Sequence, residues 1–147
     1  MRNWASAVNL WNLALNPLGQ PVQPPNSGCP SCTAVVTVNE ATHRVSFTLD
    51  YYQLGQVSKF VHPGAVRIAS NTFVTYQYPG PGQNIASAGL DDVAFRNSDG
   101  SKVLVVYNNS SAGLPFAVRF HGRYFSALIA PGATETFVWD RPRARAT

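Results

Sequence analysis

Hydrophobic residues recur with a helical period in one part of the chain, residues 50–61. Four apolar residues there fall on one helical face, at Tyr51, Leu54, Val57 and Val61. The spacing predicts an amphipathic helix over this stretch. The helix divides the chain, because the pattern before it is mixed and the pattern after it alternates.

The sequence also marks both ends of this helix. Asp50 is a suitable N-cap, and Gln53 follows three residues later, as in a capping box. Pro63 and Gly64 predict its end, since proline has no amide hydrogen and glycine tolerates turn dihedrals.

Beyond Gly64 the apolar and polar residues alternate with a period of two, which is typical of half-buried strands. Short strands are predicted at residues 66–70, 73–76, 92–96, 102–107, 115–120, 123–129 and 134–139. Turn residues separate them, and His121-Gly122 is a tight hairpin signal. The pattern predicts an antiparallel β-sandwich.

Before the helix, residues 4–15 (WASAVNLWNLAL) are too apolar for a half-exposed strand. They predict a strand buried on both faces, as in a parallel sheet or barrel, with a buried helix as the alternative. A loop rich in proline, glycine and serine follows at residues 16–33. Residues 34–38 and 44–49 are then expected to pair across a turn at 39–43.

Composition and charge exclude several classes of partner. At 147 residues the chain is long enough for one core, and 11 Gly with 11 Pro suit short strands and tight turns. The net charge of +4 depends on a C-terminal tail carrying Arg141, Arg143 and Arg145, without which it is +1. We therefore expect no nucleic-acid partner. No run is apolar enough for a membrane span, and residues 1–15 lack the features of a signal peptide, so the chain itself gives no localisation.

Four stretches carry a resemblance to a known family. They are LWNLALNP at residues 10–17, CPSC at 29–32, YYQLGQVSKFVHPGAVRIAS at 51–70 and VAFRNSDGSKVLVVYN at 93–108. Together they resemble the C-terminal part of glycoside hydrolase family 30, the glucosylceramidase-like family of retaining β-glycosidases. The resemblance implies a secreted parent in which a (β/α)8 barrel carries catalysis and a β-sandwich is attached to it.

The resemblance also implies a division of this chain. Residues 1–63 would be the strand, loop and helix at the end of the barrel, residues 64–140 the β-sandwich domain, and residues 141–147 a basic tail. The expected fold is therefore mainly β, an antiparallel β-sandwich preceded by a remnant of a (β/α)8 barrel.

Retaining glycosidases need two carboxylates about 5 Å apart, one as nucleophile and one as acid/base. The resemblance places both on earlier barrel strands, upstream of this chain. The chain has seven acidic residues, and each is explained by a cap, a turn or a strand position. We expect no catalytic residue here, and the chain alone is predicted to be inactive.

Trp11 is the one candidate substrate-binding residue. By resemblance it lies at the carboxyl end of the last barrel strand, where barrel active sites are found. Its indole face can stack on a sugar ring, and a core tryptophan is the alternative reading.

Cys29 and Cys32 are the only cysteines, in a C-x-x-C spacing. A single pair cannot close a four-ligand zinc site, and the three histidines are not spaced to help, so no metal or cofactor is expected. A short disulfide is the preferred interpretation, with two free thiols as the alternative.

Three functions remain open from the sequence. The first is the C-terminal region of a retaining, glucosylceramidase-like β-glycosidase, with a glycoside and the missing barrel as its partners. The second is a free-standing carbohydrate-binding module, and the third is a truncated product without activity. The apolar run at residues 4–15 favours the first, because a self-sufficient module has no use for it.

Overall fold

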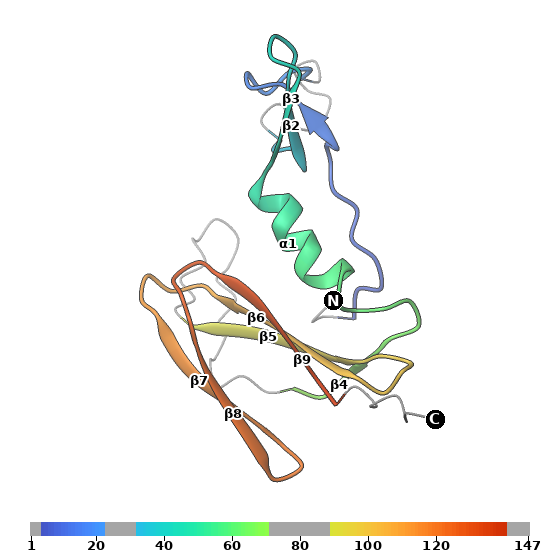
Figure 1. Cartoon of the computed structure of the whole chain (residues 1–147), viewed down its shortest axis with the longest axis vertical. Helices are drawn as coiled ribbons and strands as arrows, with labels where there is room; N and C mark the ends of the chain where they lie inside the picture. Colours follow the sequence, from blue (N-terminus) through green and yellow to red (C-terminus); the bar gives the residue numbers. More distant parts are fainter. Residues whose placement is uncertain (1–3, 23–31, 71–88, 141–147) are drawn as a thin grey trace, which may run out of the picture. The chain divides into compact units, whose positions relative to one another are not determined.

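The computed structural model describes residues 4–22, 32–70 and 89–140 (Figure 1). Its contacts divide the chain into two compact units, with the boundary between Gly55 and Gln56. The strand predicted at residues 73–76 and the tail at residues 141–147 lie outside the described residues. The predicted division at residues 63 and 140 stays a prediction.

The first unit contains a three-stranded sheet in the order β1-β2-β3. Its strands are β1 (Ala14–Leu15), β2 (Val36–Asn39) and β3 (Arg44–Phe47). β1 runs parallel to β2, and β2 pairs antiparallel with β3. In the turn between β2 and β3, Asn39 Oδ1 accepts hydrogen bonds from the amides of Ala41 and Thr42, which explains why a short polar turn joins these strands.

The apolar run at residues 4–15 does not form the predicted strand. Only Ala14 and Leu15 are in a strand, and Leu15 alone of this run is buried. The side chains of Trp4, Trp11 and Leu13 are exposed to 78%, 60% and 76%. The expectation of burial on both faces is wrong for this chain, because one parallel partner, β2, covers only its last residues.

Helix α1 (Leu49–Ser58) forms where the helical period predicted it. It begins one residue before Asp50, so the prediction of Asp50 as N-cap is wrong. The Asp50 carboxylate instead accepts a hydrogen bond from the Thr33 hydroxyl. The hydroxyl of Thr48, just before the helix, donates to the carbonyls of Ala34 and Val35 and so ties the helix start to the chain entering β2.

None of the residues of α1 is buried. The predicted apolar face is present in the sequence, but Tyr51 is exposed and Leu54 and Val57 are only half-buried. An amphipathic helix ordinarily buries such a face against a core. The first unit contains no core that covers it among the described residues.

Within the second unit, a tight turn leads from the segment after the helix into the sheet. Gly64 has a φ of +81°, and the Ala65 amide donates to the His62 carbonyl at 2.9 Å. Proline followed by a glycine with positive φ is the signature of a type II turn. The helix itself ends at Ser58, so the end predicted at Pro63-Gly64 is five residues too late.

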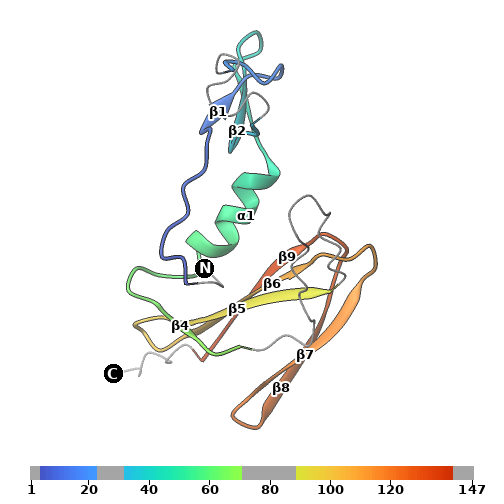
Figure 2. The ribbon, with the colours of Figure 1, turned by 180° about the vertical axis from the view of Figure 1, so that it is seen from behind.

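The second unit is built mainly on a four-stranded antiparallel sheet in the order β4-β5-β6-β9 (Figure 2). Its strands are β4 (Val66–Ile68), β5 (Leu90–Arg96), β6 (Lys102–Asn108) and β9 (Thr134–Trp139). A separate antiparallel hairpin is formed by β7 (Leu114–Phe120) and β8 (Arg123–Ile129). The described residues are thus mainly β with antiparallel sheets and one short helix, as predicted.

The core of the second unit lies between the sheet and the hairpin. Ala94, Leu104 and Val106 from the sheet form one buried cluster with Ile129 from β8. Half-buried residues from both layers surround it, namely Ile68, Leu90, Phe116, Val118, Ala133, Phe137 and Trp139. The alternation along β7 and β8 sends one set of side chains inward and leaves the other set exposed.

Strand β6 is buried on both faces of the sheet. Leu104 and Val106 face the hairpin, whereas Val103 and Val105 point to the opposite side and are also buried. On that side the Thr136 hydroxyl donates to the backbone and side-chain oxygens of Gln56, at 2.9 and 2.8 Å. The last turn of α1 therefore belongs to the second unit and packs on its sheet.

Candidate functional site

Trp11, the predicted substrate-binding residue, lies in the irregular segment three residues before β1. Its side chain is 60% exposed. The backbone of the next residue, Asn12, is anchored to the chain entering β2, since its amide donates to the Thr33 carbonyl and its carbonyl accepts from the Val35 amide. An indole face is therefore presented to solvent beside an anchored backbone, and the described residues assemble no sugar site around it.

Two acidic residues of the sheet share one face, a relationship that the sequence did not reveal. Asp92 on β5 and Glu135 on β9 are both paired with Val106 on the strand between them, so their side chains point the same way. Both are half-buried. Pairing partners cannot be read from residue spacing alone, which is why this row was missed.

A buried valine separates the backbones of these two acidic residues. Adjacent strands are about 4.8 Å apart, so backbones two strands apart are separated by about 9.6 Å. Val106 lies between them and is 1% exposed, so no substrate atom reaches the space that separates their backbones.

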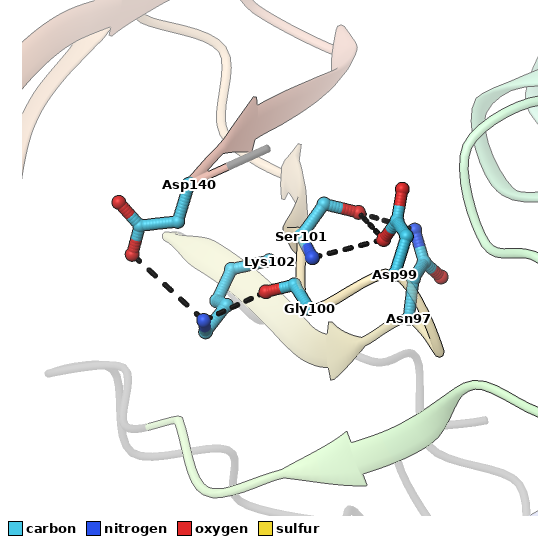
Figure 3. A network of polar contacts seen from close by, with 6 residues as sticks. All are labelled: Asn97, Asp99, Gly100, Ser101, Lys102 and Asp140. Atoms are coloured by element: carbon cyan, nitrogen blue, oxygen red, sulfur yellow. Dashed lines mark hydrogen bonds and ion pairs between the residues drawn. The ribbon is translucent and has the colours of Figure 1, made fainter. Parts of the chain in front are cut away.

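Three other carboxylates are engaged in local structure. Asp50 accepts from Thr33, as described above. Asp99 Oδ1 accepts hydrogen bonds from the amide and hydroxyl of Ser101, at 2.9 and 2.6 Å (Figure 3). Asp140 lies 3.8 Å from Nζ of Lys102, which also donates to the Gly100 carbonyl at 2.7 Å. The contacts of Asp99 and Asp140 lie in a turn and after a strand, where the sequence placed these two acids, whereas Asp50 binds Thr33 and is not the predicted cap.

The most developed polar network centres on Asn97, at the turn between β5 and β6. Its amide nitrogen donates to the Phe60 carbonyl and to the Ser101 hydroxyl, and its Oδ1 accepts from the His62 amide, all at 3.0 Å. Asn97 and Ser101 are both buried. Figure 3 shows Asn97 beside Asp99 and Ser101 in this turn. The network holds the segment that follows α1 on the edge of the sheet, so its role is attachment.

A shallow surface hollow adjoins this turn. It is lined by Gly64, Val66, Arg96, Asn97, Ser98 and Gly100. Arg96 is its one ionisable side chain, and no carboxylate lines it. The hollow lacks the residues that acid–base or nucleophilic chemistry requires.

An exposed aromatic cluster lies in the first unit. The Phe47 ring stacks on Tyr51 with centroids 4.2 Å apart, and Tyr52 meets both rings edge-on. All three side chains remain exposed. Three rings in mutual contact at the surface mark a place where further polypeptide or a ligand can pack.

The predicted Cys29–Cys32 disulfide is not tested by the described residues. Cys29 lies outside them, while Cys32 is described and is not a free cysteine. The pairing stays a prediction. The described residues contain no group of three or more histidine, cysteine or acidic side chains placed to hold a metal ion. Within the same residues, no helix has the length and apolar character needed to span a membrane.

Comparison with known proteins decides the family. The sequence profile described as "Glycosyl hydrolase family 30 beta sandwich domain" matches residues 64–137, half of the chain. The chain belongs to glycosyl hydrolase family 30. The matched segment begins at Gly64 of the type II turn and ends within β9, so it spans the sheet and the hairpin described above.

Curated relatives include other family 30 enzymes. An endo-1,6-β-D-glucanase of Neurospora crassa is 33% identical over 140 residues, which is 94% of this chain and 28% of the relative. The lysosomal acid glucosylceramidase of Mus musculus is 33% identical over 132 residues, 89% of this chain and 22% of the relative. This chain therefore spans between about a fifth and a little over a quarter of the length of such relatives.

Solved structures agree with the sequence comparison. SrfJ from Salmonella typhimurium aligns with a TM-score of 0.71 and 25% identity, over 90% of this chain and 26% of that protein. An endo-β1,6-glucanase aligns with a TM-score of 0.68 and 29% identity, over 91% of this chain and 27% of that protein. Each match takes in the first unit as well as the family 30 sandwich, because each covers about nine-tenths of the chain.

Proposed function

We propose that this chain is the non-catalytic C-terminal part of a retaining, glucosylceramidase-like β-glycosidase of family 30, in which it supports a separate catalytic portion. One observation carries the proposal. The match to the Neurospora crassa glucanase takes in 94% of this chain and only 28% of the relative. The remainder of such an enzyme, about two and a half times as long as this segment, is where the catalytic carboxylates would lie.

The exposed apolar surface of the first unit supports the same proposal. Residues 4–13 carry exposed tryptophan and leucine side chains, and α1 has no buried residue. Exposed apolar side chains are ordinary when single, but a contiguous set indicates a surface that another element covers. A preceding catalytic barrel in the same polypeptide would supply that cover.

The acidic residues of the second unit also fit a supporting role. The pair that shares a face, Asp92 and Glu135, is separated by a buried Val106 and by about two strand spacings. In the proposed parent, Trp11 contributes an aromatic face to the edge of the glycoside site, while nucleophile and acid come from elsewhere. An exported parent would be compatible with a disulfide between Cys29 and Cys32.

A chimera tests this proposal. The corresponding C-terminal segment of the Neurospora crassa glucanase is replaced by residues 4–140 of this chain, and β-1,6-glucan hydrolysis is measured. We expect the chimera to be active and the enzyme truncated at the same point to be inactive or insoluble. A Trp11→Ala chimera should raise KM, because the stacking face is removed, while a Trp4→Ala chimera serves as the matched control. An inactive but folded and soluble chimera would contradict the proposal.

A further inference from the structure

The outward face of the β7–β8 hairpin is a patterned surface that the supporting role does not use. On this face three cross-strand pairs follow one another, namely Arg119 with Tyr124, Ala117 with Ser126, and Pro115 with Leu128. All six residues are exposed, and Tyr124 and Leu128 are exposed to 66% and 65%. Figure 1 shows the hairpin as a separate ribbon beside the four-stranded sheet.

The size of the side chains varies in a regular way along this face. Successive pairs on one side of a strand are about 6.8 Å apart. The small side chains of Ala117 and Ser126 form a low floor between two taller walls. One wall is the Arg119–Tyr124 pair and the other is the Leu128–Pro115 pair. The Ser126 hydroxyl is at the floor, where it can donate or accept a hydrogen bond.

One wall combines an aromatic ring with a guanidinium group. The Arg119 guanidinium carbon lies 5.7 Å from the Tyr124 ring centroid. An aromatic face offers flat apolar area to the axial C–H groups of a pyranose ring. A guanidinium presents a planar fork of N–H donors that matches a carboxylate in bidentate geometry.

The charge of the hairpin is of one sign. From Gly113 to Ala133 the sequence contains Arg119, Arg123 and His121 and no aspartate or glutamate. Within the described residues, no carboxylate forms an ion pair with Arg119 or Arg123. Of these residues Arg119 belongs to the outward pairs, whereas Arg123 pairs with Phe120 on the opposite face. The Arg119 guanidinium makes the outward face complementary to an anion.

We propose that the outward face of the β7–β8 hairpin binds carboxylated polysaccharide, with a uronic acid ring on Tyr124 and its carboxylate on Arg119. The inference goes beyond the proposed supporting role, since it assigns a ligand to a surface remote in sequence from Trp11. A neutral glucan would contact the Tyr124 ring and the Ser126 hydroxyl but would offer no carboxylate to Arg119. A membrane surface would contact Arg119 but would not enter the low floor between the pairs.

Binding of the full 147-residue chain to polygalacturonate is the direct test, measured by titration calorimetry or affinity electrophoresis. We expect binding to polygalacturonate and much weaker binding to neutral β-1,6-glucan and to phosphatidylserine vesicles. Raising the salt from about 0.1 M to about 1 M shortens the Debye length from about 10 Å to about 3 Å and should weaken the binding markedly.

Variants locate the site. Arg119→Gln and Tyr124→Ala should each lower the affinity about tenfold, the loss expected for one charge-assisted hydrogen bond or one stacked ring. Arg119→Lys keeps the positive charge but lacks the planar guanidinium, so its affinity should lie between that of Arg119→Gln and that of the wild type. Arg44→Gln and Tyr52→Ala are matched controls, because they remove an exposed arginine and an exposed tyrosine from the first unit. Circular dichroism confirms that each variant is folded.

Three results would overturn the proposal: no binding to polygalacturonate, equal binding to the neutral glucan, or equal losses in the control variants. Tighter binding to the vesicles than to polygalacturonate would also overturn it, in favour of a lipid surface. None of these results depends on the glucanase chimera. A failed chimera with intact polygalacturonate binding would reject the supporting role alone, and the reverse outcome would reject this inference alone.

Discussion

Asn97 hydrogen-bonds the backbone of His62, 35 positions earlier in the chain, with its Oδ1 3.0 Å from the His62 amide nitrogen. The same side chain donates to the Phe60 carbonyl. One buried side-chain amide therefore provides partners for two main-chain groups in the irregular segment after the helix, where no helix or strand provides them. It joins the 51–70 and 93–108 stretches, two of the four that carried the family resemblance.

Replacing Asn97 with alanine should destabilise the protein strongly. The change removes the partner of the part-buried Phe60 carbonyl and His62 amide, while the Ser101 hydroxyl keeps only its bond to Asp99. We expect a loss of about 2–3 kcal/mol in the free energy of unfolding, measured by urea denaturation. Asn39→Ala is the matched control. Asn39 also accepts two backbone hydrogen bonds, but at an exposed turn, and its loss should cost less than about 1 kcal/mol. Equal losses would contradict the importance of burial.

Cys29 and Cys32 should be joined when the chain is produced under oxidising conditions. A C-x-x-C pair in a proline-rich loop has no metal or redox partner to explain it otherwise. Thiol titration of the denatured, unreduced protein should detect no free thiol, and titration after reduction should detect both cysteines. Two titratable thiols before reduction would show that the loop is not cross-linked.

The isolated chain should self-associate through the apolar run at residues 4–13. Trp4, Trp11 and Leu13 expose large apolar side chains that no described residue covers. Deleting residues 1–33, or replacing Leu13 with glutamine, should lower the apparent mass measured by light scattering. Leu18→Gln removes a similarly exposed leucine outside the run and should have a smaller effect. A full-length chain that is monomeric at all concentrations would count against this surface.

The isolated chain should not hydrolyse aryl β-glucosides, β-xylosides or glucosylceramide. Binding groups such as Trp11 do not accelerate a reaction when they bind substrate and transition state equally. Long incubations of the purified chain should match the background rate, as should those of Glu40→Gln and Glu135→Gln variants. Turnover abolished by either substitution would identify a working carboxylate and reject the non-catalytic proposal. Turnover unchanged by both would indicate a contaminating hydrolase.

The second unit was largely predictable because its strands pair with neighbours in the same chain. The hairpin predicted at residues 115–120 and 123–129 is observed at Leu114–Phe120 and Arg123–Ile129. Alternation of apolar and polar residues indicates that one face of a strand is buried against another layer. Here the hairpin and the four-stranded sheet provide that layer for each other. The turn at Pro63-Gly64 was predictable for a similar reason, since its dihedrals are set by those two residues themselves.

The first unit was less predictable because an apolar segment is buried only where another part of the structure covers it. The composition of residues 4–15 indicates a buried strand, yet the described chain provides a pairing partner only for Ala14 and Leu15. The apolar face of α1 was identified correctly as a pattern, although no residue of the helix is buried. Among the acids, the row formed by Asp92, Val106 and Glu135 depends on strand register, which residue spacing does not encode.

The attachment made by Asn97 constrains the amino acid at position 97 much more than those at positions 60 and 62. Its partners after the helix are a carbonyl at position 60 and an amide at position 62, groups that almost every amino acid provides. Substitutions at Phe60 and His62 therefore leave the attachment intact, apart from proline at position 62, which has no amide hydrogen. Position 97 carries the whole requirement, because the side chain must both donate and accept. The residues that follow the helix can therefore change in sequence while the segment stays attached to the sheet at the same place.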